Sequence, residues 1–129
     1  MLLFGGCASG FGPCPLGDLW AFDPSTRTWI EVTPAFGPAP RTNPALVLDA
    51  TNGRAILFAG STGAGYTFDA WSFDLADEYP VWTEQPQTGV VPEVRSSLDA
   101  TMLGGRVYLF GGIGLAGPLA DLWVADTGA

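Results

Sequence analysis

The two cysteines of the chain, Cys7 and Cys14, are the residues whose type and spacing most directly suggest chemistry. They enclose a short segment with Gly10, Gly12 and Pro13, and neither has a counterpart later in the sequence. The spacing allows a local disulfide and equally allows two free thiols. A metal site is disfavoured, because the spacing is not Cys-x-x-Cys and no histidine completes a ligand set. A disulfide would indicate an extracytoplasmic setting, and the localisation is otherwise unknown.

The other ionisable groups are mostly acidic. Thirteen acids against five arginines give a formal net charge of −8, and the absence of histidine removes the commonest general base. A carboxylate pair for glycoside hydrolysis needs a defined separation across a cleft, and no pattern here shows two acids converging. No basic stripe suits nucleic acid, and no apolar run is long enough to cross a bilayer. We therefore expect no catalytic residues, no metal, no cofactor, no nucleic-acid partner and no membrane insertion.

Most of these acids and arginines lie in a repeat, in which two phrases each occur three times about 52 residues apart. The first phrase, apolar residues followed by Gly-Gly or Ala-Gly, occupies 2–6, 56–60 and 108–112. The second, Asp-x-Trp-x-x-Asp, occupies 18–23, 69–74 and 121–126. A period near 50 with short strand-like segments is typical of propeller blades. Polar residues that recur at one place in each repeat are expected to cap turns or to join repeats, and the recurring aromatics to form the core.

Each repeat divides into four predicted β-strands. The two phrases are the second and third strands, the first strands are 46–48 and 100–103, and the fourth are 28–32 and 81–84. Asn52-Gly53 and Gly104-Gly105 between apolar runs predict type I′ hairpins, in which both central residues have positive φ. The strands are apolar on both faces, as expected of sheets covered on both sides. The predicted fold class is all-β.

The glycine pairs Gly5-Gly6 and Gly111-Gly112, followed downstream by Trp29 or Trp82, resemble kelch repeats. The Pro-x-x-Arg segments 38–41 and 92–95 resemble the same family, and the resemblance covers essentially the whole chain. It implies a fragment of a β-propeller built from four-stranded antiparallel blades. The sequence departs from the kelch pattern at Ala59-Gly60, and at Pro44 and Leu98, where many kelch units carry histidine.

Counting strands predicts one complete blade between two partial ones. Residues 1–33 hold strands two to four of a partial blade, residues 34–84 a complete blade, and residues 85–129 strands one to three of another partial blade. We expect the chain to be a fragment of a longer propeller. Its end blades would expose apolar faces and unpaired strand edges, so self-association is also expected.

Strand direction places the connections between strands two and three on the same side as those between strand four and the next strand one. These are predicted to be long loops, over 7–17, 61–68, 113–120, 33–43 and 85–96. Long loops on a rigid scaffold are where binding usually resides, and aromatic and arginine residues make the best anchors. The candidate binding residues are Phe11, Phe36, Arg41, Tyr66, Phe68 and Arg95. A structural role for the arginines, and rings folded back onto their own loops, are open alternatives.

The leading hypothesis for function is a non-catalytic kelch-like segment that binds a protein or peptide through this loop face. The alternative is a fragment of a larger kelch-like enzyme, an oxidase or a sugar-processing enzyme, whose catalytic residues lie outside the segment. A purely structural spacer is a third reading. Fold alone does not choose among them.

Overall fold

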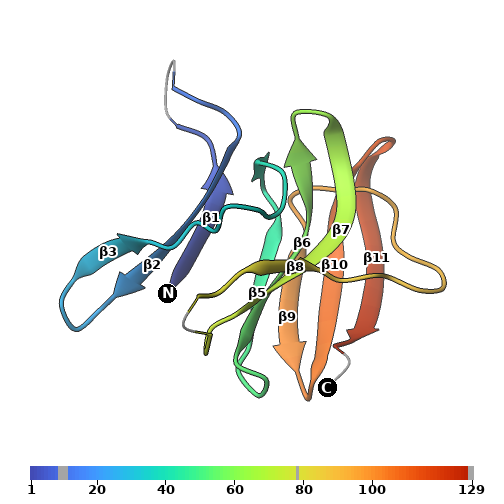
Figure 1. Ribbon diagram of the computed structural model, residues 1–129. Helices are drawn as coiled ribbons and strands as arrows, with labels where there is room; N and C mark the ends of the chain where they lie inside the picture. Colours follow the sequence, from blue (N-terminus) through green and yellow to red (C-terminus); the bar gives the residue numbers. More distant parts are fainter. Residues whose placement is uncertain (9–11, 78, 128–129) are drawn as a thin grey trace.

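A computed structural model of the 129-residue chain describes residues 1–8, 12–77 and 79–127. The described residues form β-strands and turns and no helix, which confirms the all-β prediction (Figure 1). Accordingly, the described residues contain no helix long and apolar enough to span a membrane. The strands are β1 (Leu2–Gly6), β2 (Leu16–Asp23), β3 (Thr28–Glu31), β4 (Arg41–Thr42), β5 (Ala45–Asp49), β6 (Arg54–Thr62), β7 (Gly65–Asp74), β8 (Trp82–Glu84), β9 (Asp99–Leu103), β10 (Arg106–Gly114) and β11 (Gly117–Asp126).

The strands pair antiparallel in three sheets. The first sheet has the order β1-β2-β3, the second β4-β6-β7-β8 with β5 also on β6, and the third β11-β10-β9. The second sheet stands between the other two in Figure 1, with β5 and β9 in contact across the gap to the third. The sheets thus follow the order expected of a partial propeller with one fuller blade in the middle. The blade limits at 33/34 and 84/85 stay predictions.

The small residues after Phe4, Phe58 and Phe110 shape the second strand of each sheet. Ala59, Gly60, Gly111 and Gly112 all have positive φ, and the pairing register shifts between Phe58 and Gly60 and between Phe110 and Gly112. Glycine reaches these φ values at little cost, so the strand makes a β-bulge instead of ending. Pairing then resumes on the far side of the bulge.

This continuation makes the predicted long loops over 61–68 and 113–120 wrong. Beyond the bulge, β6 pairs with β7 as far as Thr62 and Gly65, and β10 pairs with β11 as far as Gly114 and Gly117. Each connection is therefore a two-residue turn at the tip of an extended hairpin. The first sheet differs, because β1 ends at Gly6 and β2 begins only at Leu16.

The hairpins at the opposite ends of the sheets confirm one of two turn predictions. Gly104 and Gly105 have φ of 59° and 77° and join Leu103 to its partner Arg106, as a type I′ turn requires. The prediction for Asn52-Gly53 is wrong, because Asp49 pairs with Arg54 and leaves a four-residue connection in which only Gly53 has positive φ. The carboxylate of buried Asp49 accepts hydrogen bonds from Asn52 Nδ2 at 2.8 Å and Arg54 Nε at 3.1 Å, and these contacts stabilise the wider turn.

Two hydrophobic clusters cover the two faces of the central sheet. Ile56 and Phe58 of β6 belong to a cluster shared with Val107 and Leu109 of β10. Their neighbour Leu57 points to the other face and packs in a second cluster with Phe4, Leu19, Phe73 and Trp82. Successive side chains of a strand point to opposite faces of the sheet, so a strand with a continuous apolar run has both faces buried.

Candidate functional site

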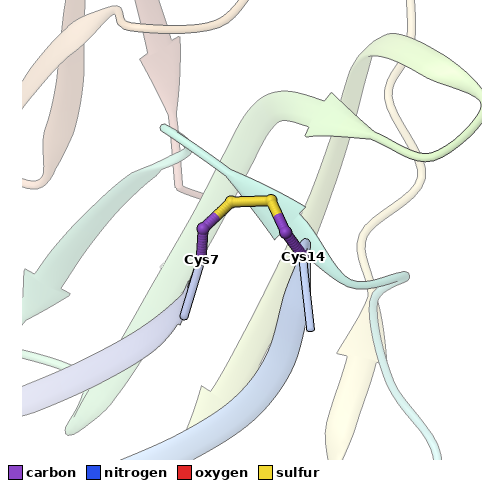
Figure 2. The surroundings of a disulfide bond; sticks show 2 residues. All are labelled: Cys7 and Cys14. Carbon is purple, nitrogen blue, oxygen red and sulfur yellow. A yellow bond between two sulfur atoms is a disulfide. The ribbon is translucent and has the colours of Figure 1, made fainter. Parts of the chain in front are cut away.

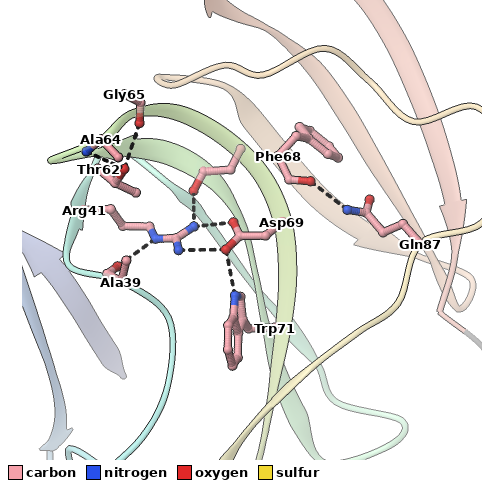
Figure 3. A network of polar contacts seen from close by, with 10 residues as sticks. Ala39, Arg41, Thr62, Ala64, Gly65, Phe68, Asp69, Trp71 and Gln87 are labelled. Carbon is pink, nitrogen blue, oxygen red and sulfur yellow. Dashed lines mark hydrogen bonds and ion pairs between the residues drawn. The ribbon is translucent and has the colours of Figure 1, made fainter.

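Arg41 is the centre of a buried polar network at the base of the β6–β7 hairpin (Figure 3). Its guanidinium donates to both carboxylate oxygens of Asp69, at 2.5 and 2.9 Å, and to the carbonyl oxygen of Ala59 at 2.8 Å. Its Nε donates to the carbonyl oxygen of Ala39 at 3.0 Å. Only 1% of the arginine is exposed. One side chain thus ties together the lead-in segment, the β-bulge and the third strand of the sheet.

Arg95 repeats this network in the third sheet. Its guanidinium donates to the two carboxylate oxygens of Asp121 at 2.6 and 2.7 Å and to the carbonyl oxygen of Gly111 at 3.0 Å. Its Nε donates to the carbonyl oxygen of Glu93 at 3.1 Å, and none of the residue is exposed. We call the Arg41–Asp69 and Arg95–Asp121 pairs the arginine clamps.

Each clamp carboxylate also accepts a hydrogen bond from the indole of its own strand, from Trp71 to Asp69 at 2.8 Å and from Trp123 to Asp121 at 2.6 Å. Burial by itself raises the pKa of Asp69, but the hydrogen bonds from Arg41 and Trp71 outweigh it and the pKa lies below its ordinary value. The hydrogen bonds from Arg95 and Trp123 hold the pKa of Asp121 well below its usual range. Both carboxylates are therefore ionised at neutral pH and matched by buried guanidinium groups.

The clamps contain two of the candidate binding residues, Arg41 and Arg95. The guanidinium groups of Arg41 and Arg95 lie inside the chain, and their hydrogen bonds go to the protein itself. They hold the lead-in segments against the second and third sheets, a structural role that their equivalent positions in two repeats allowed. Neither charge is exposed on the surface of the chain.

The three candidate aromatics among the described residues lie in different settings. Phe36 lies on the connection from β3 to β4 and is 88% exposed. Tyr66 and Phe68 lie in β7 and are half-buried; Phe68 packs on Phe58 with ring centroids 6.4 Å apart and lies 6.0 Å from the Arg95 guanidinium carbon. Phe11 lies outside the described residues. The structure therefore brings Phe68 and Arg95 together, and leaves Phe36 apart and exposed.

Sequence reasoning missed two exposed apolar residues at the tip of the β10–β11 hairpin. Leu115 is 80% exposed and Ile113 43% exposed. Leu115 occupies a two-residue turn, where polar residues and glycine are usual, and the corresponding turn residues of the β6–β7 hairpin are Gly63 and Ala64. A large apolar residue flanked by glycines was the available signal.

Cys7 and Cys14 form a disulfide across the connection from β1 to β2, with Cα atoms 4.5 Å apart (Figure 2). Cys7 directly follows β1 and Cys14 lies just before β2, so the bond closes the base of this longer connection. Among the described residues, no three His, Cys, Asp or Glu side chains gather as metal ligands would.

Comparison with known proteins decides the family. The family model described as the KLHDC2/KLHL20/DRC7 Kelch-repeats domain matches residues 1–129. The chain belongs to the kelch-repeat family. The match covers all three sheets, including the bulged strands and the arginine clamps.

Similar kelch-containing segments occur in proteins of very different size. The chain is 34% identical over 133 residues to the dynein alpha chain of the flagellar outer arm of Chlamydomonas reinhardtii, covering 98% of this chain and 3% of that protein. It is 30% identical to adagio-like protein 1 of Oryza sativa subsp. japonica, covering 98% of this chain and 20% of that protein. Serine/threonine-protein phosphatase BSL2 of Arabidopsis thaliana is 30% identical, over 87% of this chain and 11% of that protein. The chain spans a small part of each relative, and their activities are not transferred to it.

Proposed function

We propose that this kelch-repeat chain is a non-catalytic scaffold that binds a protein or peptide partner through its hairpin face. The hairpin face consists of Cys7 and Cys14 at the two ends of the β1–β2 connection, the hairpin tips at 62–66 and 113–117, and the segments 38–41 and 92–95 that lead into the second and third sheets. It is the end of the sheets at which β6 ends and β7 begins in Figure 1.

The main support for the proposal is that the β10–β11 hairpin has exposed apolar side chains at its tip and an arginine clamp that holds its strands together. Leu115 and Ile113 are exposed at the end of the β10–β11 hairpin, while Arg95 and Asp121 join its two strands at the base. Because the base is fixed before binding, a partner loses little free energy in ordering the hairpin. Exposed apolar side chains on a rigid frame supply the contact area that interfaces need.

The same networks support binding in preference to catalysis. The carboxylates of Asp49, Asp69 and Asp121 each accept hydrogen bonds from a neighbouring arginine and hold strands and turns in place. A general acid or base needs a carboxyl that can exchange its proton near neutral pH. The pKa values of these three carboxyl groups are lowered, so the groups stay ionised at neutral pH and are unsuited to that role.

The test compares two triple-alanine variants in the complete protein. In one, Tyr66, Ile113 and Leu115 of the hairpin face are replaced; in the matched control, Leu48, Leu75 and Leu103, which are exposed near the opposite turns, are replaced. A partner is first identified by cross-linking, and its affinity for each purified variant is then measured by biolayer interferometry.

The hairpin-face variant should bind the partner at least about tenfold more weakly, because apolar anchors at an interface each contribute about 1 kcal/mol or more. The control variant should bind normally. Unchanged affinity of a folded hairpin-face variant, or equal losses in both variants, would contradict the proposal. Adding Phe36→Ala tests whether the β3–β4 connection belongs to the same surface.

A further inference from the structure

The two asparagines of the chain precede residues of opposite character. Asn52 precedes Gly53, and Asn43 precedes Pro44. An asparagine side chain loses its amide group when the backbone nitrogen of the next residue attacks the side-chain carbonyl carbon. Glycine has no side chain to hinder this attack, whereas proline has no N–H to give up. The chain therefore has one asparagine suited to this reaction and a second one that serves as its internal control.

The structure leaves room for the reaction at Asn52. This residue is exposed and lies in the four-residue connection between β5 and β6, which Asp49 and Arg54 close by pairing in the sheet. Among the described residues, no heavy atom outside the immediate chain neighbours lies within 4 Å of the place that a Cβ would occupy on Gly53. A ring that forms between the Asn52 side chain and the Gly53 nitrogen therefore meets open space.

Asp49 makes the identity of residue 52 matter. The Nδ2 of Asn52 donates to Asp49 Oδ2 at 2.8 Å, and the backbone N–H of Asn52 donates to Asp49 Oδ1 at 3.4 Å. Only 1% of Asp49 is exposed, so its carboxylate depends on donors from the chain. The hydrogen bond from the Asn52 side chain is the main reason that the pKa of Asp49 lies below its ordinary value.

We propose that Asn52 is a modification site at which the chain deamidates itself, and that the product loosens the contacts around the β5–β6 turn. The Gly53 nitrogen gives its proton to hydroxide and forms a bond to Asn52 Cγ. The bond from Cγ to Nδ2 breaks, and this nitrogen takes a proton from water and leaves as ammonia. Water then opens the resulting succinimide at either carbonyl group. One opening gives aspartate, and the other gives isoaspartate, in which the main chain runs through the former side chain.

Both products remove the hydrogen bond from Nδ2 to Asp49. In the aspartate product, a carboxylate oxygen takes the place of the donor, and two negative charges face each other where the 2.8 Å hydrogen bond stood. Their repulsion is strong because burial of Asp49 limits screening by solvent. In the isoaspartate product, the main chain gains a carbon atom between Asp49 and Arg54, which form a pair of the sheet.

The altered turn would disturb two attachments that it now makes. The carbonyl oxygen of Gly53 accepts a hydrogen bond at 2.9 Å from the N–H of Leu75, just after β7. Arg54 donates to Asp49 at 3.1 Å and to the carbonyl oxygen of Thr127, just after β11 of the third sheet. The turn lies at the opposite end of the central sheet from the β6–β7 hairpin (Figure 1), so the inference does not depend on the proposed function.

Peptide mapping of the aged chain tests the reaction. The folded whole chain is incubated in mildly alkaline buffer, and trypsin, which cuts after arginine, then releases residues 42–54 as one peptide with both asparagines. Compared with a fresh sample, mass spectrometry should show OH in place of NH₂ at Asn52 and no change at Asn43. Gly53→Ala keeps Asn52 but hinders the attack, and should deamidate at least about tenfold more slowly, which corresponds to about 1.4 kcal/mol in activation free energy.

A pair of variants with equal net charge tests the consequence. Asn52→Asp carries the aspartate product, and Asn43→Asp makes the same change at the other asparagine. Hydrogen exchange of the Leu75 amide should be at least about tenfold faster in Asn52→Asp than in Asn43→Asp, because its acceptor lies in the disturbed turn. Adding Asp49→Asn to Asn52→Asp exchanges the amide and the carboxylate, and should restore most of the protection.

Three results would overturn the proposal. The first is deamidation more than about 100-fold slower in the folded chain than in the urea-unfolded chain, since about 2.7 kcal/mol of protection would mean that the fold blocks the reaction. The second is equal deamidation of the unmodified chain and a folded Gly53→Ala variant. The third is equal exchange of the Leu75 amide in Asn52→Asp and Asn43→Asp, which would show that the product leaves the turn intact.

Discussion

Replacing Arg95 with methionine should remove about 3–5 kcal/mol from the free energy of unfolding. The substitution keeps an apolar stem of similar length but removes the donors to Asp121 and to the carbonyl oxygens of Gly111 and Glu93. Removing one partner of a buried ion pair costs about 3–5 kcal/mol. The carboxylate of Asp121 is 37% exposed, so water recovers part of its loss. The carbonyl oxygens, left without a donor, cost about 1–3 kcal/mol each where water cannot reach them.

Urea unfolding of four proteins measures this effect: the unmodified chain, Arg95→Met, Asp121→Asn and the double variant. The sum of the stability losses of the two single variants should exceed the loss of the double variant by about 1–3 kcal/mol, because both substitutions break the same network. Arg27→Met removes an exposed guanidinium and should change stability by less than about 0.5 kcal/mol. A loss below about 1 kcal/mol for Arg95→Met, or additive single effects, would refute the structural role assigned to the clamp.

Four further outcomes are expected. The pKa values of the clamp carboxylates are lower in the folded chain than the unfolded value of about 3.9. Their stabilisation is therefore present above that pH and is lost as the pH falls below it, so the melting temperature should drop steeply from about pH 4 downward. A melting temperature that stays constant below pH 4 would contradict this prediction. The mass of the unfolded chain should rise by two hydrogens on reduction, and Cys7→Ser with Cys14→Ser should cost up to about 2.5 kcal/mol by loop-closure entropy; an unchanged mass would refute the disulfide. Gly112→Ala should lower the free energy of unfolding by more than about 2 kcal/mol, because the new Cβ would lie 2.6 Å from the Ser96 carbonyl oxygen at a φ of 101°. Gly53→Ala has open space around it and should lower the free energy of unfolding by about 1 kcal/mol. Equal losses of stability in thermal melting would contradict this difference in packing. The isolated chain should self-associate through the free edges of β3 and β11, and a sharp monomer in light scattering at all concentrations would refute this.

Much of the fold could be predicted because the repeat carries its own internal comparison. Three copies of the same two phrases give strand order and direction without any knowledge of tertiary contacts. The prediction of long loops at 61–68 and 113–120 was wrong because Ala59-Gly60 and Gly111-Gly112 suggest the end of a strand. Their positive φ values make a bulge, and whether pairing resumes after a bulge depends on the facing strand and not on the local sequence.

The candidate site was predicted less well, and Arg41 and Phe68 show why. Whether an arginine in a lead-in segment faces solvent or a partner inside the chain depends on a carboxylate 28 residues away, and sequence spacing does not reveal that distance in space. Likewise, Phe68 was assigned to a loop, but it lies on a strand and half-buried against Phe58. Recurrence indicated correctly that the arginines belong to the architecture.

The arginine clamps also bear on how the chain folds. Each joins residues only 28 or 26 positions apart, so each hairpin and its lead-in can assemble from nearby chain before the sheets meet. Few backbone hydrogen bonds cross between the second and third sheets, among them Gly60 N to Arg95 O and Ser97 N to Asn43 O. Strong local closure with sparser coupling between neighbours makes unfolding approximately a nearest-neighbour process, in which the end sheets open before the central one. Arg95 contributes both to the local closure and to the coupling between sheets. Its side chain joins the strands of the third sheet, and its carbonyl oxygen accepts a hydrogen bond from Gly60 N of the second sheet.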